Sequence, residues 1–87
     1  MNNYKRYLHD TKIDIMEAIH NDNTHELDKV YEMLERDMGI NQEVLENYDL
    51  SPDDYAELKE FIEGMSELQA LIDDYLARRY WYDRRTR

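Results

Sequence analysis

Apolar residues recur every three or four positions along most of the chain, which is the spacing of one face of a helix. The longest such stretch follows Ser51 and Pro52, which suit the cap and the first position of a helix. We predict one long helix over about 52–82 and regard it as the element around which the chain is organised. Its expected buried face consists of Leu58, Phe61, Ile62, Met65, Leu68, Ile72, Tyr75 and Leu76.

Two shorter periodic stretches precede this helix. The first predicts a helix over about 3–20. Its apolar face contains Tyr4, Leu8, Ile15 and Ile19. Polar residues then interrupt the pattern, and Asn23 with Glu26 resembles a capping box for a second helix over about 24–38. Because the connection is short, the two helices should form an antiparallel hairpin.

Gly39 is well placed to end the second helix, and Asn41 is a suitable cap for a short helix over about 41–47. We therefore expect an all-α fold, a small helical bundle in which the hairpin and the short helix pack on the long helix. At the usual rise per residue the long helix spans about 45 Å, which is more than its partners can cover. Its far end is expected to contact a second copy or another partner.

The composition supports a single acidic helical domain over residues 1–87. The chain has 2 Gly and 1 Pro against 37% charged residues, which is typical of helices rather than of turn-rich sheets. The absence of Cys excludes disulfides and thiolate chemistry. No stretch resembles a signal peptide or a membrane span, so we expect a cytoplasmic protein, in the host cytoplasm if a phage encodes it.

The formal net charge of −10 is unevenly distributed. Residues 1–20 are neutral, with three acids and three bases. Residues 21–76 carry 17 acids against 3 bases, a net of −14, whereas residues 77–87 carry 5 Arg against 1 Asp, a net of +4. This distribution favours association with partners of a particular charge. The alternative is that the acidity only keeps a small protein soluble.

The sequence contains no glycine-rich phosphate loop, nucleophile elbow or thiol, so we expect a protein that is not an enzyme and needs no cofactor. Glu17 and His20 have the spacing used in carboxylate-bridged di-iron bundles, but a second such pair is missing. His20 is better explained as a residue at a helix end. We predict no catalytic, cofactor-binding or metal site.

Acidic residues line one side of the predicted long helix, at steps of three, four and seven positions. Few Lys or Arg residues are placed to neutralise them, although Glu63 could pair with Lys59. The second helix contributes further acids. The predicted partner-binding residues are Asp53, Glu57, Glu60, Glu63, Glu67, Asp74, Glu32 and Glu35. A solvated helix face with no partner is the alternative interpretation.

A rigid helix with regularly spaced negative charge resembles the phosphate array of a nucleic acid, and it can compete for the Lys and Arg residues that bind that array. In composition, size and Tyr content the chain is similar to the small acidic DNA-mimic proteins that phages and plasmids use against host nucleases. The similarity is one of composition and covers no motif. It implies an inhibitor or regulator of a nucleic-acid-binding enzyme, which would be a protein partner with a basic surface.

The basic end at residues 77–87 interleaves Arg with aromatic residues. The predicted oligomer or partner contacts are Tyr75, Arg78, Arg79, Tyr80, Trp81 and Tyr82. Such a segment could stack on bases while its arginines bind phosphates, so a nucleic-acid-binding regulator is one alternative function. A structural homo-oligomeric assembly protein is another. We favour docking of this end on a second copy, in a homodimer, or a simple favourable interaction with the helix dipole.

Overall fold

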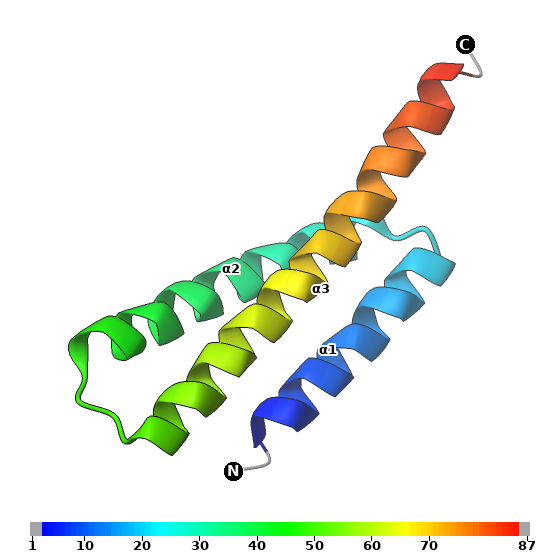
Figure 1. The fold of residues 1–87 in the computed structure, drawn as a ribbon. Helices are drawn as coiled ribbons and strands as arrows, with labels where there is room; N and C mark the ends of the chain where they lie inside the picture. The colour runs from blue at the N-terminus through cyan, green and yellow to red at the C-terminus, as the bar shows by residue number, and fades with distance from the viewer. Residues whose placement is uncertain (1–2, 86–87) are drawn as a thin grey trace.

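The protein consists of three helices in the computed structural model, which describes residues 3–85 and the side chains of residues 4–80. Helix α1 covers Asn3–His20, α2 covers Thr24–Asn47 and α3 covers Pro52–Arg85. No strand occurs in the described residues, and the three helices contact one another pairwise (Figure 1). The predicted all-α bundle is therefore confirmed. None of these helices is both long and apolar enough to cross a membrane.

The predicted break between the second helix and a short third helix is wrong, because α2 continues to Asn47. Gly39 does not adopt a positive φ, so it is an ordinary helical residue. Asn41 donates a hydrogen bond from its side chain to the Asp37 carbonyl, 2.7 Å away in the preceding turn, instead of capping a new helix. The last turns of α2 pack Val44 and Leu45 against the core, and this packing outweighs the local helix-ending signal.

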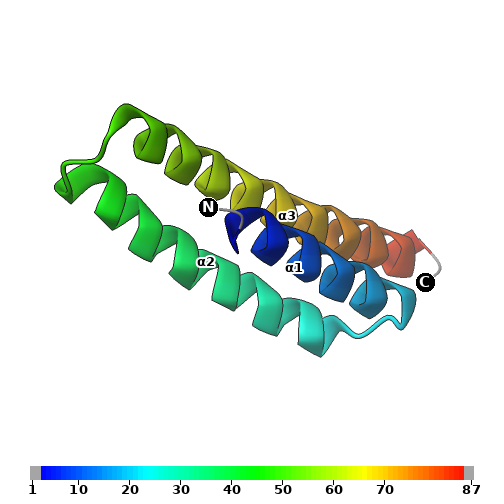
Figure 2. The same cartoon turned by 90° about the horizontal axis from the view of Figure 1, so that it is seen from below.

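The core lies where the three helices face one another, and α3 contributes half of its ten buried hydrophobic residues. The fully buried side chains are Ile15, Leu27, Leu34, Met65 and Ile72. Figure 2 shows α2 and α3 as a hairpin, with α1 lying along the part of it nearest the α1–α2 turn. The predicted apolar face of the long helix is confirmed, with Leu58, Phe61 and Leu68 also buried.

Aromatic rings near the start of α1 attach this helix to the hairpin. Tyr4 stacks on Phe61 of α3 with ring centres 4.4 Å apart, and Tyr7 meets the same ring edge-on at 5.2 Å. The Tyr7 hydroxyl donates a 2.5 Å hydrogen bond to the Asp37 carboxylate of α2. Burial, followed by this hydrogen bond and the negative charge of Asp37, raises the pKa of Tyr7 above its ordinary value of 10.0.

Side-chain caps begin two of the helices as the sequence predicts. The Ser51 hydroxyl accepts a 3.2 Å hydrogen bond from the Asp54 backbone N–H at the start of α3. The Asn23 side chain accepts a 3.2 Å bond from the Glu26 N–H at the start of α2. Each cap satisfies a backbone donor that has no partner inside its own helix.

The two glycines differ in what surrounds them, and this difference gives a prediction. We expect Gly39→Ala to raise the free energy of unfolding by about 1 kcal/mol, because Ala favours the helix and nothing lies within 4 Å of the added Cβ. A Cβ at Gly64 would lie 2.6 Å from the Leu8 Cδ1, so Gly64→Ala should raise the free energy of unfolding by less than Gly39→Ala does. Urea denaturation measures both variants. In a Leu8→Ala background the gain from Gly64→Ala should recover, and equal gains in both backgrounds would contradict the close approach of α1.

Candidate protein-binding surface

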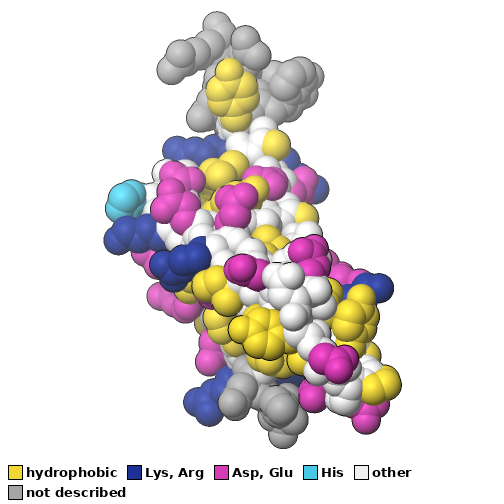
Figure 3. All heavy atoms as spheres, turned by 90° about the vertical axis from the view of Figure 1, so that its left-hand side faces the viewer, with side chains coloured by type: hydrophobic (Ala, Val, Ile, Leu, Met, Phe, Trp, Pro, Cys, Tyr) yellow, Lys and Arg dark blue, Asp and Glu magenta, His cyan; other side chains and the backbone are white. Residues whose placement is uncertain are grey.

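The acidic side chains predicted on the long helix lie along one side of α3. We call this surface the acidic ridge and define it as Asp53, Glu57, Glu60, Glu63, Glu67 and Asp74. All six are exposed except Glu57, which is half-buried. Figure 3 shows acidic side chains spread over one face of the molecule, with hydrophobic side chains between them.

Most of the ridge keeps its charge without a neutralising partner. Among the described residues, the ion pairs within 4 Å include Asp74 with Arg78, at 3.1 Å, but none involves Asp53, Glu60, Glu63 or Glu67. The pair that the sequence suggested between Lys59 and Glu63 is therefore not formed. Because an exposed ion pair contributes little to stability, the lack of ion-pair partners for these four carboxylates costs the folded protein little free energy.

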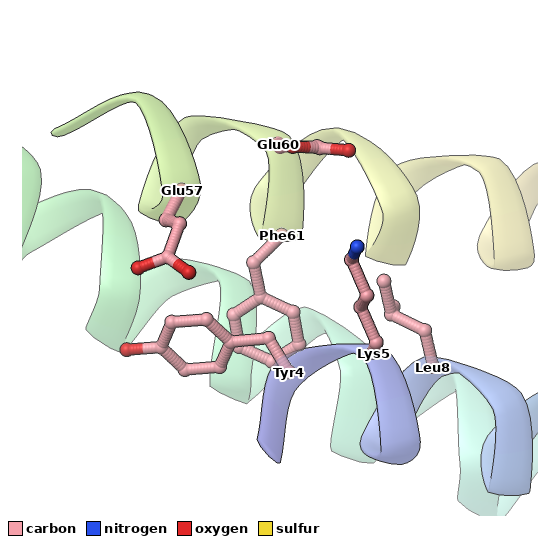
Figure 4. Close-up of a pocket in the computed structure, with 6 residues that line it drawn as sticks. All are labelled: Tyr4, Lys5, Leu8, Glu57, Glu60 and Phe61. Atoms are coloured by element: carbon pink, nitrogen blue, oxygen red, sulfur yellow. The ribbon is translucent and has the colours of Figure 1, made fainter. Parts of the chain in front are cut away.

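Helix α1 brings positive charge to one edge of the ridge. Lys5 of α1 lines a hollow of about 50 Å³ together with Glu57 and Glu60 (Figure 4). In this view the Glu57 carboxylate points toward Tyr4, and the Lys5 side chain rises from α1 toward α3. A second hollow, further along the same side, is lined in part by Lys12 and Glu67. Beside α1, the edge of the ridge therefore contains both acidic and basic side chains.

The two predicted acids of α2, Glu32 and Glu35, are exposed but do not join the ridge. Glu35 lies near Tyr31, whose hydroxyl donates a 3.5 Å hydrogen bond to the Asp73 carboxylate of α3. The charge of Asp73, then burial, then the charge of Glu35 raise the pKa of Tyr31. The Tyr31–Asp73 hydrogen bond joins α2 to α3, whereas Glu60 and Glu67 of the ridge line hollows shared with α1.

Two predicted contacts near the C-terminal end are used within the chain. Tyr75 donates a 2.5 Å hydrogen bond to the Asp22 carboxylate, and the Arg79 guanidinium pairs with the same carboxylate. Tyr80 is 63% exposed. Arg78, as noted, pairs with its own helix. The side chains of Trp81 and Tyr82 lie outside the described residues. Sequence reasoning therefore missed the role of Asp22 as the common partner of two α3 side chains.

Asp22 also has an unusual backbone conformation, with φ 54°. The Asn23 N–H bonds to the Ala18 carbonyl at 2.8 Å, and the Asp22 N–H bonds to the Ile19 carbonyl at 3.1 Å. These two bonds form a Schellman motif that ends α1, in which Gly is the usual residue at the left-handed position. The contacts to α3 help an Asp residue to hold a conformation that L-residues otherwise disfavour.

Substitutions at Asp22 should separate the backbone effect from the side-chain contacts. We expect Asp22→Ala to lower the free energy of unfolding by about 1–2 kcal/mol, because it removes both contacts and keeps the unfavourable φ. Asp22→Gly loses the same contacts but adopts this φ freely, so its loss should be smaller by about 1 kcal/mol. Chemical denaturation of the two variants measures this difference. Equal losses would contradict the left-handed conformation.

In the described part of the chain, no group of three or more His, Cys, Asp or Glu side chains could hold a metal ion. Comparison with known proteins finds no family model that matches the sequence, no similar curated protein and no similar solved structure.

Proposed function

We propose that the protein is a non-enzymatic binding protein whose acidic ridge engages a basic surface of a partner protein. In its most concrete form it inhibits or regulates a nucleic-acid-binding enzyme by occupying the Lys and Arg residues that bind phosphates, as phage and plasmid DNA mimics do. It acts in the cytoplasm and associates with a second copy of itself. The observation that carries the proposal is the set of four exposed carboxylates of Asp53, Glu60, Glu63 and Glu67 on one helix, none of which forms an ion pair with another described residue.

The spacing of these carboxylates limits the size of the basic surface that they can match. From Asp53 to Glu67 the helix rises about 21 Å, so the four charges lie on average about 7 Å apart along the axis. Duplex DNA carries one charge per about 1.7 Å of its axis. The ridge therefore suits a local patch of phosphate-binding residues rather than a whole DNA channel. Burial of such a patch excludes the nucleic acid from that site by direct competition.

A competition assay tests the proposal. A fluorescent DNA duplex is bound to each of a panel of purified nucleases and other DNA-binding proteins, and displacement by the wild-type protein is followed by anisotropy. We expect displacement from at least one of them. The direct affinity of the wild-type protein for that member, measured without DNA, should weaken by about tenfold or more between about 50 and about 200 mM salt. Asp53→Asn combined with Glu60→Gln, Glu63→Gln and Glu67→Gln should abolish the displacement while the helical circular dichroism stays unchanged.

A matched control removes the same number of charges from exposed acids away from the ridge. Its four substitutions are Asp28→Asn, Glu43→Gln, Glu46→Gln and Asp49→Asn. This control variant should still displace DNA, because its ridge is intact. The proposal fails if the wild-type protein displaces DNA from no member of the panel. It also fails if both quadruple variants lose activity equally, since net charge rather than the ridge would then explain the effect.

A further inference from the structure

At one end of the bundle, α2 and α3 extend beyond the described part of α1. Tyr4, in the first turn of α1, stacks on Phe61, which lies nine residues after the start of α3 at Pro52. The first turns of α3 therefore extend about 13 Å beyond the part of α3 that α1 covers. The last turns of α2 extend in the same direction, as Figure 2 shows. At this end the α2–α3 hairpin is not matched by a described turn of α1.

A groove lies in this position, and we call it the end groove. It is a hollow of about 280 Å³. It is lined by the apolar side chains of Val44, Leu50 and Leu58, together with Tyr4, Asn41, Asp54 and Glu57. Tyr4 and Glu57 also line the smaller hollow drawn in Figure 4, so the two hollows adjoin. The end groove therefore combines apolar side chains with two carboxylates.

The opposite end of the molecule has the complementary properties. Arg79 pairs with Asp22 in the α1–α2 turn, so the helical residues 80–85 extend beyond that turn, as Figure 1 shows. We call residues 80–85 the α3 overhang. Tyr80 is the described side chain of the overhang and is largely exposed. By sequence the overhang continues with Trp81 and Tyr82, and residues 80–87 carry three Arg against one Asp.

We propose that the α3 overhang of one copy docks in the end groove of a second copy, where it packs on the ends of α2 and α3 that the described part of α1 does not cover. The overhang cannot reach the end groove of its own chain. Leu58 and Tyr80 lie on the same helix, 22 residues and therefore about 33 Å apart along its axis. A second copy of the chain is thus the source of the occupant.

Shape and charge both support this pairing. The ends of α2 and α3 that the described part of α1 does not cover are about 13 Å long, and the overhang is itself helical with a length of about 9 Å. Aromatic residues with an adjacent Arg are the types that dominate protein interfaces, because they bury much apolar area around a charged group. The charges are also complementary by sequence, because the end groove contains Asp54 and Glu57 and the overhang contains Arg84 and Arg85.

Charge reversal in the full-length chain tests the proposal. The groove variant carries Asp54→Lys and Glu57→Lys, and the overhang variant carries Arg84→Glu and Arg85→Glu. In sedimentation velocity the wild-type protein should associate as its concentration rises. Each variant alone should raise the dissociation constant by at least about tenfold, because like charges then face each other. An equimolar mixture of the two variants should associate again, since intact and reversed surfaces are paired.

A second measurement locates the contact. A synthetic peptide of residues 77–87 is titrated into the isotope-labelled overhang variant, and amide chemical shifts are followed by NMR. We expect the largest changes at Asn41, Val44 and Leu50. Changes centred on Glu63 and Glu67 would overturn the proposal, because the peptide would then bind the ridge. A wild-type protein that stays monomeric, or variants that associate as the wild type does, would also overturn it.

The docking proposal deepens the self-association in the proposed function, and its test is separate from that of the acidic ridge. The overhang variant retains the whole acidic ridge, so its monomer should still displace DNA in the competition assay if the ridge engages a basic partner. If the wild-type protein associates, and the overhang variant is monomeric but still displaces DNA, both proposals hold. If the wild-type protein displaces DNA but does not associate, the docking proposal and the proposed self-association fail, and the role of the ridge stands. If it associates through the groove and displaces no DNA, only the proposed function fails.

Discussion

Replacing Phe61 with Ala should lower the free energy of unfolding by about 3–5 kcal/mol, the largest loss that we expect from a single substitution in this chain. Phe61 is buried and holds two aromatic rings of α1, through the stacked contact with Tyr4 and the edge contact with Tyr7. Its removal leaves a cavity and also removes the aromatic surface on which α1 is docked. Because small domains are stable by only about 5–15 kcal/mol, the variant should be close to unfolding.

Urea denaturation measures the loss, and hydrogen exchange shows where it acts. Amides of α1 should lose more protection than those of α2 and α3, which pack together mainly through other residues. Tyr55→Ala is the matched control, because Tyr55 is an exposed aromatic residue of the same helix. Its effect on stability should be below about 0.5 kcal/mol. A loss at Phe61 no larger than that of the control would contradict the docking of α1 on this ring.

Tyr7→Phe should lower the free energy of unfolding by about 1–2 kcal/mol at neutral pH. The hydroxyl donates a short hydrogen bond to the Asp37 carboxylate, a charged acceptor on a different helix. Phe retains the ring and its edge contact with Phe61, so the substitution removes little besides the hydroxyl. Chemical denaturation of both proteins measures the difference. A loss as large as that expected at Phe61 would show that the ring, and not the hydrogen bond, had been disturbed.

The stability contributed by Tyr7 should depend on pH in the alkaline range. Its folded-state pKa is raised above 10.0, first by burial and then by the hydrogen bond to Asp37, so the folded protein retains a proton that the unfolded chain releases. Stability that is fully present below pH 10 is therefore lost as the pH rises above it. The difference between the wild-type protein and Tyr7→Phe should narrow above pH 10. A difference that is constant up to pH 11 would contradict this assignment.

The sequence was sufficient to predict the helices wherever local signals and apolar spacing agree. Ser51 and Pro52 begin α3, and Asn23 with Glu26 begins α2, as the capping chemistry requires. Gly39 was misleading because its helix-ending tendency is worth only about 1 kcal/mol. Packing of the following apolar residues outweighs a preference of this size, and packing between distant segments is not visible in a local pattern.

The candidate site was predictable to a similar extent. Positions on one helix follow from its periodicity, so the ridge on α3 could be placed from the sequence. The positions of Lys5 and Lys12 beside the ridge could not be predicted, because they depend on how α1 is rotated against α3. Asp22 offered one overlooked signal, since Asp directly after a helix is among the residues that tolerate a positive φ. Its two partners on α3 lie 53 and 57 residues away, beyond the reach of local reasoning.

These distant partners of Asp22 have a consequence for the order of folding. Contacts between residues far apart in sequence require the closure of a large loop, and in small helical proteins such contacts form late. The α2–α3 hairpin, with its four-residue connection, should therefore assemble first, and the junction of Asp22 with Tyr75 and Arg79 should form after it. In kinetic experiments Asp22→Ala should then accelerate unfolding and leave the refolding rate almost unchanged. The contacts of the turn between α1 and α2 should therefore slow unfolding without contributing to the folding nucleus.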